Sequence, residues 1–169
     1  MFELLEFLII HQCHIDSVRR ADESSSVDLG ALGWVGPSTV LASIGGVLLT
    51  RFVAMALLKP EPAFGPFNLM LTVVDTTLFV SLGVWTFKRV ASLALDPIGT
   101  YRLIAFKALL LSFLPDIALG MSHFPAATWP NVFALMAEHV AAWAVCVSML
   151  TQLTRTGRGT LAERKAPRE

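Results

Sequence analysis

Two apolar stretches near the end of the chain decide the fold: YRLIAFKALLLSFLPDIALGM over residues 101–121 and WPNVFALMAEHVAAWAVCVSML over residues 129–150. Each holds about 20 residues, and a helix of that length, at about 1.5 Å rise per residue, crosses a hydrocarbon core of about 30 Å. Only the short connection His123–Thr128 separates them. The two stretches therefore predict a hairpin of membrane-spanning helices.

The composition of the whole chain agrees with a membrane protein. Of the 169 residues, 54% are hydrophobic and 15% are charged, whereas soluble domains average about 25% charged residues. The length predicts one domain. No basic patch with interleaved aromatic residues is present, which argues against nucleic acid as a partner.

Two further apolar segments precede this hairpin, so we expect an all-α integral membrane bundle of four helices over residues 33–154. Residues 1–30 are polar in their second half and predict a flexible cytoplasmic leader, with a short interfacial helix at 1–12 as an option. Residues 155–169 predict a disordered basic tail. The expected spans are about 35–58, 68–87, 101–121 and 130–152.

The distribution of lysine and arginine predicts the orientation. Four spans place both termini and the 88–100 loop on one side, and the opposite side holds only Lys59. The positive-inside rule then places both termini in the cytoplasm. We expect a bacterial inner-membrane protein whose helices run up-down-up-down. The basic residues on the predicted cytoplasmic side are Arg19, Arg20, Lys88, Arg89, Arg102, Arg155, Arg158, Arg164, Lys165 and Arg168.

Five ionisable residues are expected in the outer half of the bundle, namely Arg51, Asp75, Asp116, Glu138 and His139. Counting about 1.5 Å per residue from the outer helix ends places Arg51 level with Asp75, on helices joined by a short turn. This predicts an Arg51–Asp75 ion pair. A sixth group, Lys107, is expected near the inner end, where it can snorkel to the headgroups.

A charge at the centre of a membrane helix costs roughly 2.5–3.5 kcal/mol even on a lenient scale, so these groups should face each other or a wet cavity. Three interpretations stay open. The groups can act as interhelical glue or snorkel outward; they can hold a proton or a cation, with His139 as a relay; or they can bind a ligand or a lipid headgroup. We favour the first.

Two patterns describe expected packing faces. Ser43, Gly45 and Gly46 give the first span a small-residue face on which another helix can approach closely. His139, Trp143 and Cys146 follow the spacing i, i+4, i+7, which indicates a single packed face rather than a metal or haem site. No other histidine lies inside a span to act as a second axial ligand.

Motifs of the common enzyme classes are missing: there is no G-x-S-x-G, H-E-x-x-H, C-x-x-C or phosphate-binding glycine loop. His11, Cys13 and His14 have no second pair of ligands at a suitable spacing for a metal. We therefore expect no catalytic residue, no cofactor and no metal site.

The runs LLSFLPD, ending at Asp116, and ALMAEHVAAW, around His139, resemble the small bacterial membrane proteins grouped as domain of unknown function 6069. The resemblance covers about residues 33–154. It implies a four-helix integral membrane protein and assigns no biochemistry or catalytic residue.

These observations favour a non-enzymatic structural or partner-binding membrane protein. The alternative is a small proton- or cation-coupled carrier or channel subunit that uses Asp75, Asp116, Glu138 and His139 as a homo-oligomer. The expected partners are the lipid bilayer and either further copies of the chain or another membrane protein.

Overall fold

The computed structural model describes residues 27–58, 68–122 and 127–155. Within these ranges the chain forms four helices and no sheet, which confirms the all-α fold class. The helices are α2 (Leu32–Leu58), α3 (Leu69–Leu93), α4 (Pro97–Met121) and α5 (Trp129–Leu153). The predicted interfacial helix at 1–12 and the tail beyond Arg155 lie outside the described residues.

All four helices are long and apolar enough to cross a membrane. At about 1.5 Å per residue, 25 to 27 residues extend about 38–40 Å. The most apolar stretch of each helix is only 6–28% buried inside the bundle, so large apolar side chains such as Leu41, Phe52 and Leu111 face outward. Such a surface suits lipid rather than water, and it indicates a multi-pass membrane protein.

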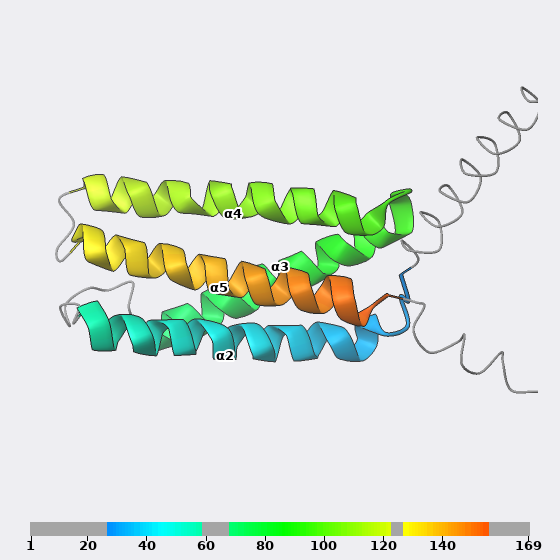
Figure 1. The fold of residues 1–169 in the computed structure, drawn as a ribbon, viewed down its shortest axis with the longest axis horizontal. Helices are drawn as coiled ribbons and strands as arrows, with labels where there is room; N and C mark the ends of the chain where they lie inside the picture. The colour runs from blue at the N-terminus through cyan, green and yellow to red at the C-terminus, as the bar shows by residue number, and fades with distance from the viewer. Residues whose placement is uncertain (1–26, 59–67, 123–126, 156–169) are drawn as a thin grey trace, which may run out of the picture.

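Helices α3 and α5 each pack against the other three helices, whereas the backbones of α2 and α4 do not approach each other. In Figure 1, α3 crosses behind α5, from the side of α2 to the side of α4. An isolated bridge joins Val27, before α2, to Arg155, after α5, so α2 and α5 are antiparallel. We call the end that carries this bridge the terminal end of the bundle, and the opposite end the loop end.

Local sequence explains where three of the helices begin. The Asn68 side chain accepts hydrogen bonds from the backbone N–H groups of Met70 and Leu71 and so caps α3. Asp96 caps α4 by accepting from the Gly99 N–H, and Pro97 occupies the first helical position, where its missing N–H costs nothing. Pro130 has the corresponding place in the first turn of α5.

The helices are longer than the expected spans at the terminal end. Helix α3 continues from Phe87 to Leu93, and α4 begins at Pro97 rather than near Tyr101. The connection is therefore residues 94–96 instead of the expected 88–100 loop. Lys88 and Arg89 remain within α3, because a helix does not have to stop where its residues become charged.

The apolar core fills the half of the bundle nearest the terminal end. It is centred on Val35, Val80, Phe87, Tyr101, Cys146, Val147 and Leu150. The rings of Phe87 and Tyr101 meet edge to face, with centroids 4.9 Å apart, which joins the end of α3 to the start of α4. The half nearest the loop end is different in character, because the ionisable side chains of Arg51, Asp116 and Glu138 are buried there.

The small-residue face predicted on α2 is confirmed for two of its three members. Ser43 is fully buried, and a Cβ atom on Gly46 would lie 3.3 Å from the Val145 side chain of α5. A Cβ atom on Gly45 would have no neighbour within 4 Å. The close approach of α2 to α5 therefore uses Gly46, which lies three residues after the buried Ser43, while Gly45 faces away from it.

Candidate functional site: a polar layer inside the bundle

Each of the four helices contributes at least one buried polar residue to the half of the bundle nearest the loop end. Their relative exposures are 6–9% for Arg51, Thr72, Asp116 and Glu138, and the half-buried His139 contacts Asp116. We call these five residues the polar layer. They lie about three to ten residues from the helix ends at the loop end, roughly 5–15 Å along the helix axes.

Arg51 connects α2 to α3. Its Nη1 donates a hydrogen bond of 3.1 Å to the Thr72 hydroxyl, and its charge also acts on the Glu138 carboxyl of α5. Thr76, one helical turn beyond Thr72, is buried as well. The guanidinium therefore lies near both a neutral hydroxyl of α3 and a buried acid of α5.

Asp116 connects α4 to α5. Its Oδ2 lies 3.2 Å from the His139 Nε2, a distance suitable for an ion pair if the imidazole is protonated. The contact does not meet hydrogen-bond geometry, since the buried Asp116 Oδ2 has no hydrogen-bond partner. The His139 side chain is 38% exposed, so this pair extends from the bundle interior to its surface.

Glu138 is the most buried acid of the polar layer, with 6% relative exposure. The charges of Arg51, His139 and Asp116 all act on its carboxyl, the Arg51 charge most strongly. Its Oε1 is buried and has no hydrogen-bond partner. Glu138 therefore links the Arg51 side of the polar layer to the Asp116–His139 side.

Asp75 does not belong to the polar layer, and the predicted Arg51–Asp75 ion pair is wrong. Arg51 donates to Thr72 instead, and the Asp75 side chain is exposed on α3. Residues 75 and 76 are about 100° apart around a helix, and it is Thr76 that faces inward. The prediction compared only depth along the helices and ignored rotation about their axes.

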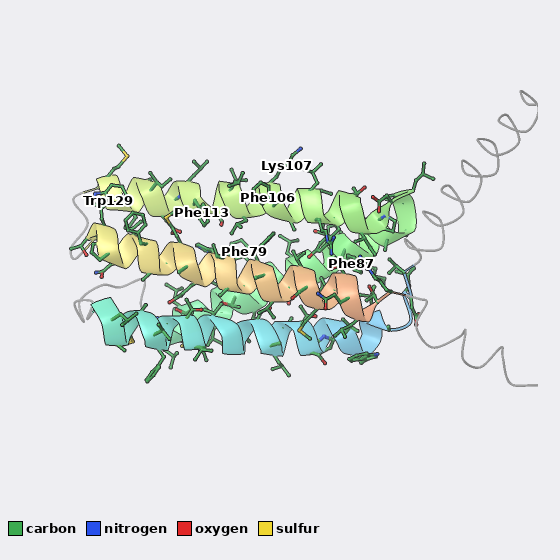
Figure 2. All side chains as sticks on the ribbon, in the orientation of Figure 1. Phe79, Phe87, Phe106, Lys107, Phe113 and Trp129 are labelled. Atoms are coloured by element: carbon green, nitrogen blue, oxygen red, sulfur yellow. The ribbon has the colours of Figure 1, made fainter. Side chains whose placement is uncertain are left out.

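Lys107 is likewise on the outside of the bundle. Figure 2 shows its side chain on α4, extending away from the other helices. It is the eleventh residue of the 25-residue α4, deeper than expected because α4 begins earlier. Among the described residues, neither Lys107 nor Asp75 forms an ion pair. The acidic Asp75 and the basic Lys107 thus both face outward from helices that are candidate membrane spans.

The packed face predicted for His139, Trp143 and Cys146 is confirmed, and its partner is α4. His139 contacts Asp116, the Trp143 ring meets Phe106 with centroids 6.4 Å apart, and the Cys146 Sγ lies 3.5 Å from the Tyr101 hydroxyl. The face thus covers the middle of the α4–α5 interface.

Sequence reasoning missed Thr72 and Thr76, the residues of α3 that face the bundle interior. Their spacing of four residues repeats at Val80, which is the signal that could have identified the inward face of α3. A search for ionisable residues passes over neutral threonine hydroxyls, yet the Thr72 hydroxyl accepts a hydrogen bond from Arg51.

Within residues 27–58, 68–122 and 127–155, no three His, Cys, Asp or Glu side chains gather as a metal site would need. The sequence cluster His11, Cys13 and His14 lies outside the described residues.

No family model, curated protein or solved structure matches the chain.

Proposed function

We propose that the chain is a non-enzymatic, partner-binding protein of a bacterial cytoplasmic membrane. It crosses the membrane four times, up-down-up-down, with both termini in the cytoplasm. The four apolar helices support the multi-pass assignment. The antiparallel α2–α5 pair and the excess of Lys and Arg in the terminal segments and at the end of α3 support the topology and orientation.

One observation carries the partner-binding proposal: Asp75 and Lys107 are exposed on the outside of apolar helices. Asp75 lies about 9 Å from the loop end of α3, and Lys107 lies about 20 Å from the loop end of α4. Each faces outward, where lipid would surround it if the chain were alone.

The energetic argument follows from the cost of a charge in hydrocarbon. Lysine has a long stem and can reach toward a headgroup, but aspartate has a single methylene and cannot. On the insertion scale an aspartate at the helix centre costs roughly 2.5–3.5 kcal/mol. A second copy of the chain, or another membrane protein, that covers these positions with complementary polar groups would remove that cost.

The experiment is photocrosslinking in the native membrane. A photoreactive residue replaces Leu78, one turn from Asp75, or Leu111, one turn from Lys107; both leucines are well exposed. We expect covalent protein–protein products at both positions, with a mass that distinguishes a second copy from a different protein. Leu41 on α2, also highly exposed, is the matched control and should give lipid adducts.

The variants Asp75→Asn and Lys107→Leu test whether the charges matter. They should reduce the protein–protein products at residues 78 and 111, while native mass measurement in mild detergent should show a smaller assembly. Lipid adducts alone at both positions, together with a strict monomer in detergent, would contradict the proposal.

The runs LLSFLPD and ALMAEHVAAW support a further proposal, membership of the domain of unknown function 6069 family. That family has no assigned biochemical activity, so the partner-binding proposal depends on the exposed Asp75 and Lys107 alone.

A further inference from the structure

The buried carboxyls of the polar layer outnumber its permanent positive charge. Asp116 and Glu138 are both more than nine-tenths buried, and the only permanent cation among the five residues is Arg51. With both carboxyls ionised and His139 neutral, the polar layer would carry one net negative charge. A charge inside a membrane bundle is costly, and one bound proton would neutralise this one.

A second observation points to the same ligand. Asp116 Oδ2 and Glu138 Oε1 are buried oxygens without a hydrogen-bond partner. Acids that serve only as structural contacts accept hydrogen bonds from their neighbours, because an unpaired buried polar atom is destabilising. A proton on a carboxyl removes its charge and turns one of its oxygens into a donor.

The geometry favours a proton over a metal ion. The described residues offer no group of three side chains suited to a metal, whereas a proton needs only one carboxyl. Burial penalises the charged form of a carboxyl, and both carboxyls are buried, so the proton is placed on them. The His139 side chain is 38% exposed and serves as the route of exchange.

The surroundings of the two carboxyls come from all four helices. Arg51 of α2 and His139 of α5 are the ionisable side chains that act on Glu138 besides Asp116 of α4. Helix α3 contributes the neutral Thr72 hydroxyl, which accepts a hydrogen bond from Arg51. The acidic residue of α3, Asp75, is exposed on the outside of the bundle. His139 is the one ionisable member with substantial exposure.

We propose that Asp116, Glu138 and His139 form a proton-binding site inside the membrane domain. One proton resides on the two buried carboxyls at neutral pH and exchanges through the half-exposed imidazole. In the exchange step, the His139 ring, whose Nε2 lies 3.2 Å from Asp116 Oδ2, first turns until its N–H points at that oxygen. The Nε2–H bond of the protonated ring then breaks while an O–H bond forms at Asp116 Oδ2. The imidazole returns to its neutral form, and the carboxylate becomes a neutral acid.

This site lies inside the bundle and is independent of the outward-facing Asp75 and Lys107. A proton-coupled carrier or channel subunit, the alternative suggested by the sequence, would need such a site. Proton binding at this site can be tested without a known substrate.

The test is infrared difference spectroscopy of the full chain in lipid bilayers. We expect the C=O band of a protonated carboxyl near neutral pH. It should be lost or shifted in Asp116→Asn or Glu138→Gln, and unchanged in Asp75→Asn, the matched control on the outside of α3. His139→Gln should leave the band in place but slow its exchange in deuterated water by about tenfold or more.

The absence of a protonated carboxyl near neutral pH would overturn the proposal, as would a band that neither Asp116→Asn nor Glu138→Gln alters. An exchange rate unaffected by His139→Gln would overturn the route through the imidazole. Unaltered protein carrying isotope-labelled aspartate or glutamate gives the same assignment if a variant fails to fold, since the label shifts the band of the acid that holds the proton.

Discussion

Arg51 is the residue whose loss should disturb the polar layer most. Its guanidinium is the permanent positive charge beside Glu138, and it is 9% exposed. Removing one partner of a buried charged pair typically costs about 3–5 kcal/mol, because the remaining charge is left uncompensated. Arg51→Met should therefore destabilise the bundle strongly.

The double variant Arg51→Met/Glu138→Gln supplies the control, because it also removes the charge left behind. Its free energy of unfolding should be higher than that of Arg51→Met alone. Tryptophan fluorescence during unfolding in mixed micelles measures both values. If the two changes were simply additive, Arg51 and Glu138 would not be coupled.

Thr72 gives a second test at the residue scale. Thr72→Val keeps the shape but removes the hydroxyl that accepts from Arg51. A hydrogen bond between membrane helices contributes about 0.6 kcal/mol on average, and one to a charged group more, so we expect a loss of about 1–2 kcal/mol. Thr77→Val is the matched control, since the exposed Thr77 hydroxyl bonds only to its own helix; an equal loss in both variants would contradict this assignment.

At the residue scale, sequence predicted part of the polar layer. Arg51, Asp116, Glu138 and His139 were identified because ionisable residues are rare in apolar helices. Asp75 is included wrongly, since the prediction compares depth along the helices and leaves out rotation about their axes, which the spacing of Thr72, Thr76 and Val80 indicates for α3. The Arg51–Thr72 contact depends on that rotation.

At the element scale, the close approach of α2 to α5 can be tested with two neighbouring glycines. Gly46→Leu would press against Val145, 3.3 Å from the position of a Cβ atom, whereas Gly45→Leu would enter open space. Overpacking typically costs about 1–3 kcal/mol. We expect that loss for Gly46→Leu and little change for Gly45→Leu in thermal unfolding in detergent. Equal behaviour of the two variants would place the α2–α5 contact elsewhere.

The start of α4 makes another prediction at this scale. Asp96 caps the helix by accepting from the Gly99 N–H, and losing such a cap costs about 1 kcal/mol. Asp96→Ala should lower the unfolding free energy by that amount and increase hydrogen exchange in the first turn of α4. Thr128→Ala is the control, because Thr128 makes no side-chain cap to α5; it should have little effect.

The helix boundaries show what local sequence can and cannot specify. The expected 88–100 loop contains Asp96–Pro97, although an aspartate followed by a proline is also the pattern of a capped helix start. The end of α3 was placed at Phe87 because hydrophobicity stops there. Hydrophobicity marks where a helix leaves the apolar region, and the hydrogen bonds of α3 continue to Leu93.

At the scale of the whole molecule, the number of helices and their membrane character followed from length and apolar content. Which helices pack against each other did not follow from length and apolar content. The contacts of α5 with α2 and α3, and the separation of α2 from α4, are not specified by short connections, which constrain only consecutive helices. The close packing at Gly46 and the charged contacts of the polar layer select this arrangement.

The central claim is a four-span bundle with both termini on one side, and labelling of single cysteines in intact cells tests it most directly. In a Cys13→Ser background, Leu95→Cys and Thr156→Cys report the terminal end, while Ala63→Cys and Ala126→Cys report the loop end; the native Cys146 is buried. A membrane-impermeant reagent should label positions 63 and 126 and reach positions 95 and 156 only after the membrane is opened. Labelling of position 95 or 156 in intact cells, or protection of position 63 or 126, would contradict the account.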